Sequence, residues 1–169
     1  TLRCPGITPH YIAPLYSHRS GIHRQLPVEK DIDIAFAGNL NHAAHVQRGR
    51  LLEKVAALLD CYKVVIASEL PVEEYTALFS RARIVFNHCL RGEMNLRCFE
   101  AMACGALLFV EAENLEVPDW VRDREDAVFY REENLVELLH DYLARPKEIT
   151  RIAGNGVALS ERLAGEMRL

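Results

Sequence analysis

The sequence predicts an α/β fold, with an open, doubly wound, mainly parallel sheet covered by helices on both faces. The segments VVIA, IVFN and LLFV are apolar at nearly every position. This pattern is typical of parallel strands that are buried on both faces. Segments with apolar residues at helical spacing alternate with these strands along the chain. Because connections between parallel strands are almost always right-handed, the alternation favours a doubly wound sheet.

The individual elements follow from residue 31 onward. The first strand, DIAFAG over residues 33–38, is short and apolar, and it ends at a glycine before a polar loop. Apolar residues at helical spacing then predict a helix over residues 47–59. Gly105 is the residue type expected just after a helix, and Pro146 separates the last two helices. The other expected strands are residues 63–68, 83–89, 106–112 and 126–131, and the other expected helices are 70–82, 95–104, 135–143 and about 148–161.

The chain is expected to hold one domain and a lead-in. Residues 1–30 contain four prolines and no sustained periodicity, which indicates an irregular linker. Residues 31–169 then form a single Rossmann-like domain, because 169 residues give one domain a full core but not two. Since the first residue is Thr1 rather than methionine, we expect the chain to be a piece of a longer protein.

Composition narrows the classes of function. The formal net charge is −4 and no block of Lys and Arg is present, so we expect no nucleic-acid partner. No apolar run approaches the roughly 20 residues of a membrane span, and no signal peptide is recognisable. Five scattered cysteines without a CxxC spacing indicate reduced thiols and a cytoplasmic location. The seven histidines complete no familiar ligand set, so we expect no metal site.

Three common motifs are absent from the sequence. It contains no GxGxxG, no GxxxxGK[ST] and no GxSxG. These absences argue against a nicotinamide dinucleotide fingerprint, a P-loop and a nucleophile-elbow hydrolase. Any phosphate binding must therefore depend on a helix N-terminus and on arginines.

Ligands of such a sheet bind beyond the carboxyl ends of the strands. In this chain, polar loops follow three of the expected strands. After the first strand, Gly38 allows close approach to the backbone, and Arg48 could meet a phosphate or remain solvated. After the strand at 106–112, residues 111–116 have the polarity of a surface loop. The richest loop, after the strand at 83–89, carries His88, Arg91, Gly92, Glu93 and Asn95. His88 there could contact a ligand or serve as a hydrogen-bonded structural histidine, and Asn95 also suits a helix N-cap.

Glu100 poses a specific question. At about 100° per residue it falls on the same half of its helix as Leu96 and Phe99. A carboxylate is almost never buried without a partner. Its partner could be an arginine such as Arg97 or Arg83, in which case the domain need bind nothing, or it could be a ligand.

The segment NLRCFEAMACGALLF, residues 95–109, resembles the C-terminal half of glycosyltransferases with the GT-B fold. It is most similar to the branch that includes the CgeB-like spore-maturation proteins. In that branch a strand ending in F-G-N opens the domain, and RG-x-N-x-R-x-FEA-x-A-CG precedes the fourth strand. This chain has FAGN at residues 36–39 and RGEMNLRCFEAMACG at residues 91–105. The resemblance extends from about Asp31 to the end.

The resemblance implies a domain that binds a nucleotide-sugar donor for transfer of the sugar to an acceptor, without a bound metal. Glu100 would accept hydrogen bonds from the ribose hydroxyls, and the backbone near Asn95 and Leu96 would face the pyrophosphate. Arg48 would neutralise the phosphates, with Arg50 or Arg91 as the alternatives to it. The other residues implied in donor binding are Gly38, Asn39, His88 and Gly92.

One departure concerns the catalytic residue. Many retaining members have two glutamates eight positions apart, but here the earlier position is Gly92 and the nearest acid is Glu93. Either the loop is shifted by one residue, which makes Glu93 the catalytic candidate, or the role of the first glutamate is altered or lost. The resemblance leaves open the nucleobase, the sugar, the acceptor and the stereochemistry.

A second departure is that GT-B enzymes work between two domains, and this chain has room for one. We therefore expect the N-terminal acceptor-binding domain to be missing and the isolated chain to be inactive. The alternative is a non-catalytic nucleotide-binding or assembly module, because a fold does not fix a function.

Overall fold

The computed structural model describes residues 23–41 and 46–166, apart from the side chains of the last two of these residues. The predicted lead-in before residue 23 therefore lies outside the described residues. The described chain forms a five-stranded sheet in the order β2-β1-β3-β4-β5, and every pair of neighbouring strands is parallel. The strands are β1 (Ile32–Ala37), β2 (Val64–Ala67), β3 (Ala82–Phe86), β4 (Leu107–Glu111) and β5 (Val128–Tyr130). The predicted fold class is confirmed.

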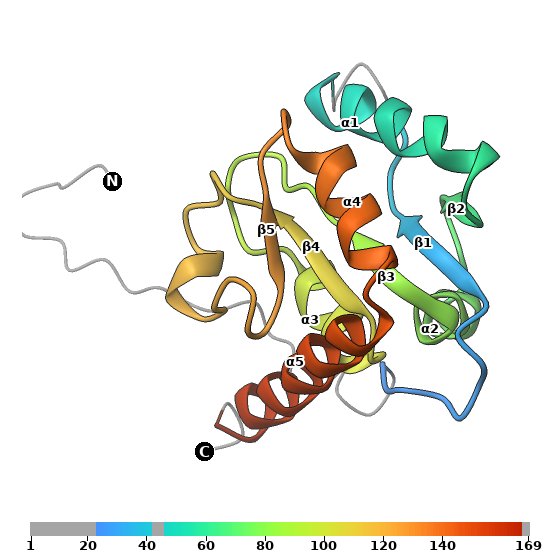
Figure 1. The fold of residues 1–169 in the computed structure, drawn as a ribbon. Coiled ribbons are helices and arrows are strands. Elements are labelled where there is room, and N and C mark those ends of the chain that lie inside the picture. Colours follow the sequence, from blue (N-terminus) through green and yellow to red (C-terminus); the bar gives the residue numbers. More distant parts are fainter. Residues whose placement is uncertain (1–22, 42–45, 167–169) are drawn as a thin grey trace, which may run out of the picture.

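Helices connect the strands and cover both faces of the sheet (Figure 1). The α-helices are α1 (Val46–Ala56), α2 (Val72–Arg81), α3 (Leu96–Ala103), α4 (Leu135–Leu143) and α5 (Pro146–Glu166). Two short 3-10 helices, η1 (Ala57–Asp60) and η2 (Val117–Asp119), follow α1 and β4. Helices α2 and α3 pack on one face, α1 and α4 pack on the other, and α5 contributes to both cores.

The alternation of side chains along the strands explains why both faces need helices. In β4, Leu107 and Phe109 face the core under α1 and α4, whereas Leu108 and Val110 face the core under α2 and α3. All four of these side chains are fully buried. Because consecutive strand residues point to opposite faces, a run that is apolar at every position requires a cover on each side.

Several predicted helix boundaries differ from the observed ones, including the end of α1 and the start of α5. The expected helix over residues 47–59 is regular only to Ala56, and its last turn is the 3-10 helix η1. The last helix begins at Pro146 rather than two residues later. Proline lacks a backbone N–H and has a helical φ, so it fits the first turn, where that N–H has no partner in the helix.

The segment between residue 23 and β1 has no regular structure but packs against the domain. The Leu26 amide donates to Ser80 Oγ over 3.1 Å. Lys30 Nζ donates to the Ala82 carbonyl over 2.7 Å. A side-chain carbon added at Gly105, whose φ is +73°, would lie 2.6 Å from the Gln25 side chain. Part of the predicted lead-in therefore rests directly on α2 and on the end of α3.

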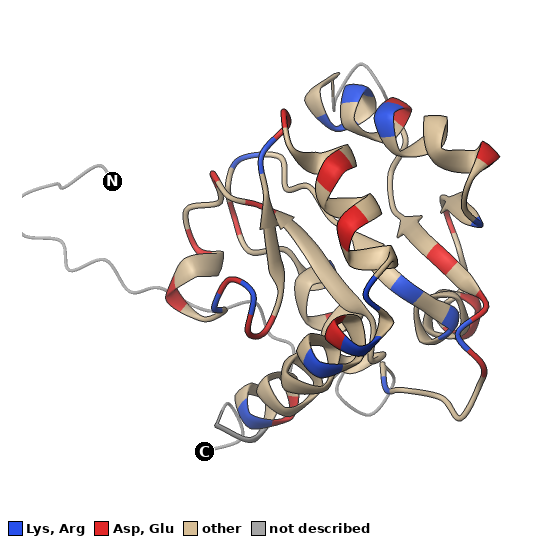
Figure 2. Cartoon of the chain, in the orientation of Figure 1, with Lys and Arg blue, Asp and Glu red and all other residues tan. Residues whose placement is uncertain are grey.

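The charges of both signs are interspersed along the ribbon rather than gathered into blocks (Figure 2). Among residues 23–41 and 46–166, no helix is both long enough and apolar enough to cross a lipid bilayer.

Candidate functional site

Two adjoining cavities open at the carboxyl edge of the sheet. The first has a volume of about 470 Å³ and lies between the end of β1, helix α2 and the start of α3. The second has a volume of about 480 Å³ and lies between the loops that follow β1 and β2. In the strand order 2-1-3-4-5, the direction of winding reverses between β1 and β3, and ligands of doubly wound sheets bind at this reversal. The first cavity lies at that position.

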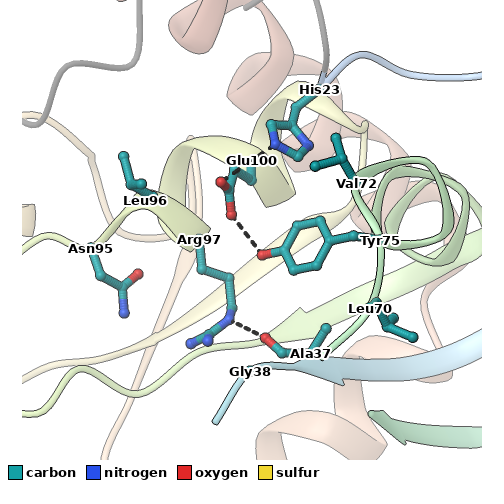
Figure 3. Close-up of a pocket in the computed structure, with 10 residues that line it drawn as sticks. All are labelled: His23, Ala37, Gly38, Leu70, Val72, Tyr75, Asn95, Leu96, Arg97 and Glu100. Atoms are coloured by element: carbon teal, nitrogen blue, oxygen red, sulfur yellow. Dashed lines mark hydrogen bonds and ion pairs between the residues drawn. The ribbon is translucent and has the colours of Figure 1, made fainter. Parts of the chain in front are cut away.

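Glu100 lies on the wall of the first cavity, and it is only 5% exposed. The Tyr75 hydroxyl on α2 donates a hydrogen bond of 2.6 Å to its Oε2. His23 Nε2 lies 3.5 Å from its Oε1, and the other ring nitrogen of His23 is 3.1 Å from Thr76 Oγ1. Figure 3 shows the carboxylate between His23 and Tyr75. The described contacts of this buried carboxylate thus include a histidine and a tyrosine.

The two arginines considered as partners of Glu100 have other partners. Arg83 forms an ion pair with Asp33, with an N–O distance of 3.2 Å. Arg97 donates through Nε to the Ala37 carbonyl and through Nη1 to Asn87 Oδ1, both over 2.7 Å. Neither arginine is within ion-pair distance of Glu100 among the described residues, so the expected arginine ion pair does not account for its burial.

Tyr75 acts as a hydrogen-bond donor to Glu100. Its burial, together with the negative charge of Glu100, raises the pKa of the phenol far above its ordinary value. The phenol therefore keeps its proton and donates to the carboxylate. Its ring also lies 4.3 Å from the ring of Phe79 and 5.5 Å from that of His23, measured between centroids, so its position is fixed by packing.

Residues at the end of β1 border both cavities. Gly38 lines both, and Asn39 lines the second. The side-chain oxygen of Asn39 accepts a hydrogen bond from the Asn41 amide over 2.8 Å. The backbone carbonyl of Asn39 accepts one from Arg48 Nη2 over 2.6 Å. Arg48 is buried, with its guanidinium 5.7 Å from the centroid of the Phe36 ring. It lines a separate, much smaller cavity of about 40 Å³.

The start of α3 also faces the first cavity, through Asn95 and Leu96. Asn95 occupies the N-cap position, but its side chain makes no capping hydrogen bond to the helix. Its Nδ2 donates instead to Asn87 Oδ1 over 3.2 Å. The Cys98 amide donates to the Asn95 carbonyl over 3.1 Å. The earlier amides of a helix have no partner within it, so those of Leu96 and Arg97, two residues that line the cavity, have no acceptor in α3.

The loop before α3 places its predicted site residues elsewhere. The Glu93 carboxylate accepts hydrogen bonds from the backbone amides of Leu90 and Arg91, over 3.3 and 2.7 Å. Gly92 has a φ of +77° and lies against the side chain of Leu115. Arg91, Gly92 and Glu93 line neither of the two large cavities.

His88 belongs to a second buried polar group, at the ends of β3 and β4. Its Nδ1 lies 3.3 Å from the Tyr130 hydroxyl and 3.8 Å from Glu111 Oε2. Burial lowers the pKa of His88, and the nearby Glu111 carboxylate opposes this effect. His88 lines the small cavity with Arg48, not the cavity that contains Glu100.

One expectation about the loop after β4 is wrong. Glu111 and Asn114 are not surface residues, because they are only 5% and 4% exposed. Asn114 Nδ2 donates to Glu111 Oε1 over 2.7 Å and to the Glu93 carbonyl over 3.0 Å. These hydrogen bonds connect the loop after β4 to the loop before α3. Buried polar side chains are needed there because apolar ones could not make these bonds.

The sequence profile of the glycosyl transferase-like family matches residues 19–165. The chain belongs to this family. No curated protein matches the chain.

Several solved structures share this fold. The C-terminal domain of a group 1 family glycosyl transferase from Francisella tularensis has a TM-score of 0.64 at 13% identity, and the match covers 85% of this chain and 96% of that domain. Sucrose-phosphate synthase from Thermosynechococcus elongatus has a TM-score of 0.57 at 15% identity, covering 92% of this chain and 48% of the enzyme.

A third structure is that of the Anabaena protein HepE in complex with UDP-glucose. It has a TM-score of 0.57 at 12% identity, and the match covers 80% of this chain and 40% of that protein. At these identities the likeness shows a shared fold, the C-terminal domain of GT-B glycosyltransferases. This glycosyl transferase-like chain spans less than half the length of the two larger proteins.

Three residues of this glycosyl transferase-like site were not identified as candidates from the sequence: His23, Tyr75 and Arg97. His23 comes from the predicted linker, and Tyr75 comes from a helix expected only to pack. Arg97 was considered only as a possible ion-pair partner of Glu100. Glu100 itself could have indicated that donors were required, but nothing local in the sequence identifies residues that reach it from other elements.

Proposed function

We propose that this chain is the donor-binding domain of a glycosyltransferase that transfers a sugar from a nucleoside diphosphate sugar to an acceptor. The observation that carries the proposal is the position of Glu100, a buried carboxylate on the wall of a cavity at the winding reversal of the sheet. Its oxygens are fixed by Tyr75 and His23, and each carboxylate oxygen can accept more than one hydrogen bond. The vicinal hydroxyls of a ribose are suitable donors for such a group.

The remaining parts of the site suit a nucleotide. The uncapped amides of α3 and the adjacent Gly38 can approach an anion closely. Besides Glu100, the donor-binding residues that border the two large cavities are Gly38, Asn39, Asn95 and Leu96. In this proposal Arg48 supplies positive charge from beside the end of β1, so the diphosphate does not depend on a resident metal. The complex of a protein of the same fold with UDP-glucose supports a nucleotide sugar as the class of ligand.

The proposal includes an acceptor-binding domain that is not part of this chain, and membership of the branch that includes the CgeB-like proteins. The second point is supported by the sequence RGEMNLRCFEAMACG before β4. His88, Arg91 and Gly92 lie outside the two large cavities, so their contribution would require the sugar or a second domain to extend toward the loop before α3.

One observation favours a second candidate, a non-catalytic nucleotide-binding module. The Glu93 carboxylate is bonded to two backbone amides of its own loop and lines neither large cavity. A catalytic Glu93 would have to leave these amides when the donor binds. In the second candidate the same cavity binds a nucleotide, and Glu93 only shapes the loop.

Titration of the chain with UDP, GDP, ADP and dTDP by calorimetry tests the proposed function. We expect one of the four to bind, and we expect Glu100→Gln to weaken its binding by about 1–3 kcal/mol, because a hydrogen bond to a charged acceptor is lost. The matched control is Glu113→Gln, since Glu113 is exposed and pairs with Arg131 away from the cavities. If none of the four binds, or if Glu100→Gln binds as tightly as the unaltered chain, the ribose role is wrong.

A further inference from the structure

Arg97 is held rigidly across the ends of two neighbouring strands. Its Nε donates to the Ala37 carbonyl at the end of β1, and its Nη1 donates to Asn87 just after β3. The guanidinium also lies over the Phe36 ring, with its central carbon 4.6 Å from the ring centroid. Three contacts on fixed elements leave the planar group little freedom. Its orientation is therefore set before any ligand arrives.

The third nitrogen of Arg97, Nη2, lies beside Gly38, and both residues line the first cavity. Figure 3 shows the guanidinium group next to Ala37 and Gly38. Within the described part of the chain, this nitrogen donates to no acceptor, although Nε and Nη1 both do. A side-chain carbon at position 38 would overlap Nη2 directly and would lie 3.2 Å from the Phe36 ring. Glycine at this position therefore leaves room for the guanidinium. The position of Nη2 therefore depends on the absence of a side chain at Gly38.

The positive charge near this nitrogen is not neutralised by an ion pair. Among residues 23–41 and 46–166, no carboxylate lies within ion-pair distance of Arg97 or Arg48, although Glu93 is near enough to act on Arg48 electrostatically. Both guanidinium groups lie against the same Phe36 ring. Burial, and then the positive charge of Arg97, lowers the pKa of Arg48. Two partly buried cations that repel each other favour a bound anion.

Arg97, which would bind an anion, and Glu100, which would bind hydroxyl groups, are positioned to contact the same ligand. Arg97 and Glu100 are on the same helix, three residues apart, which corresponds to about 4.5 Å along the axis. Glu100 turns toward His23 and Tyr75, whereas Arg97 turns toward Ala37 and Gly38 (Figure 3). A ligand that spans both positions needs hydroxyl groups next to a phosphate. A nucleoside phosphate has this order of groups.

We propose that Arg97 binds the diphosphate of the donor through Nη2, over Gly38, and thereby makes the site select nucleoside diphosphates over nucleosides. This inference rests on the proposed function and adds the residue that determines its dependence on phosphate. Arg48 adds charge from the other side of the β1 end but makes no contact with the cavity that Arg97 lines. Lysine at position 97 could supply the charge but not the three fixed donors, because its ammonium lacks the planar arrangement.

The test compares a diphosphate with its own nucleoside. The probe is whichever of UDP, GDP, ADP and dTDP the unaltered chain binds, and the nucleoside is measured by protein NMR if its binding is weak. We expect Arg97→Gln to lower affinity for the diphosphate about tenfold to a hundredfold, and affinity for the nucleoside less than about twofold. The control is Arg83→Gln, a half-buried arginine of β3 that pairs with Asp33, lines neither large cavity and should leave both affinities unchanged.

A second variant keeps the charge and moves the donor. In Gly38→Ala the added methyl group displaces Nη2, so we expect the same selective loss of diphosphate affinity. Its control is Gly154→Ala in α5, where an added carbon meets no atom within 4 Å. This pair keeps the test decisive if Arg97→Gln folds poorly, because both glycine variants retain the Arg97 side chain and its charge.

The outcomes separate the inference from the function on which it rests. If the unaltered chain binds none of the four diphosphates, the proposed function fails and this inference fails with it. If the diphosphate binds but Arg97→Gln and Gly38→Ala retain its affinity, or lose diphosphate and nucleoside affinity equally, only the inference is overturned. An equal loss would show that Arg97 acts by holding the ends of β1 and β3 together.

Discussion

At the scale of single residues, the central feature is a carboxylate that the protein already holds before a ligand binds. Glu100 has a donor at each oxygen, Tyr75 on one side and His23 on the other. These contacts compensate for the cost of burying the charge, and they also fix its direction. A carboxylate fixed in this way can bind hydroxyl groups without first losing side-chain freedom. The same contacts explain why the residue is conformationally defined in the absence of a ligand.

We expect Tyr75→Phe to weaken nucleotide binding. The change removes the 2.6 Å hydrogen bond to Glu100 and leaves the ring in place. A hydrogen bond to a charged group contributes about 1.5–3 kcal/mol, so the loss of affinity should be about tenfold or more. The measurement is calorimetric titration with the nucleotide that the unaltered chain binds.

The control for Tyr75→Phe is Tyr62→Phe. The Tyr62 hydroxyl lies 2.8 Å from His140 Nδ1, outside both large cavities, so this variant should bind as the unaltered chain does. If Tyr75→Phe binds the nucleotide more tightly, the phenol competes with the ribose for Glu100, and its role in orienting the carboxylate is wrong.

At the scale of elements, the site depends on how loops and helix ends meet. The amides and side chains near the start of α3 are positioned by Asn87 after β3 and by the loop after β4. Glu116 Oε2 accepts from the Met94 amide over 2.8 Å, which fixes the residue just before the N-cap. Glu111 at the end of β4 and the loop residues Glu93 and Asn114 thus support the geometry of the helix start through contacts with the backbone. Polar residues that look superficial in the sequence are structural here.

Asp31, just before β1, links the end of α2 to the residue that precedes β2. Its carboxylate accepts hydrogen bonds from Arg81 at the end of α2, over 2.7 and 2.8 Å, and from Lys63 before β2, over 2.6 Å. The Arg81 hydrogen bonds first, and then that of Lys63, hold the pKa of Asp31 well below its usual value. The charged carboxylate is therefore favoured in the folded state relative to the unfolded state.

We expect the Asp31 carboxylate to make the free energy of unfolding depend on pH in the acid range. A carboxyl whose pKa is lowered on folding stabilises the protein above its unfolded-state pKa, and the contribution is lost as the pH falls below about 4. Asp31→Asn should therefore show a smaller fall in stability than the unaltered chain between about pH 6 and about pH 3. Urea denaturation midpoints across this range measure the effect.

The matched control for this pH dependence is Asp60→Asn. Asp60 is exposed, and among the described residues it takes part in no ion pair, so its variant should follow the unaltered chain. Identical pH profiles for Asp31→Asn and the unaltered chain would contradict the proposed contribution of Asp31.

At the scale of the whole molecule, the cavities lie along one edge of a single domain. They open at the carboxyl ends of β1 and β2, next to the start of α3. The same fold makes up 48% of the synthase and 40% of HepE, so the rest of those proteins has no counterpart here. In the proposed function, the acceptor is bound by a domain outside this chain.

We therefore expect the isolated chain to bind a nucleotide but to transfer no sugar. The measurement is release of the nucleoside diphosphate from its sugar, with and without a panel of sugar, peptide and lipid acceptors. The expected rate is indistinguishable from that of the Glu100→Gln variant. Transfer at an ordinary enzymatic rate, about 1 s⁻¹ or faster, would show that one domain is sufficient.

Much of the fold was predictable because its signals are local. Apolar periodicity identified all five strands and five α-helices, and Gly105 and Pro146 marked real boundaries. Helix ends were less exact, as in α1, because the last turn tightened into a 3-10 helix through contacts that the pattern does not contain. Of the site, the sequence indicated Gly38, Asn95 and Glu100 as neighbours of one cavity. The grouping follows because strand ends and helix starts are adjacent in any doubly wound sheet.

By itself, the sequence determined the class of fold, the edge of the sheet where a ligand would bind, and the likeness to glycosyltransferases. Only the tertiary structure decided which side chains face Glu100 and which face away. Tyr75 is 25 residues from Glu100 in the chain, and Arg97 reaches an Ala37 carbonyl that is 60 residues away. Periodicity reports burial within one element, whereas these contacts depend on how three elements pack, so no local pattern contains them.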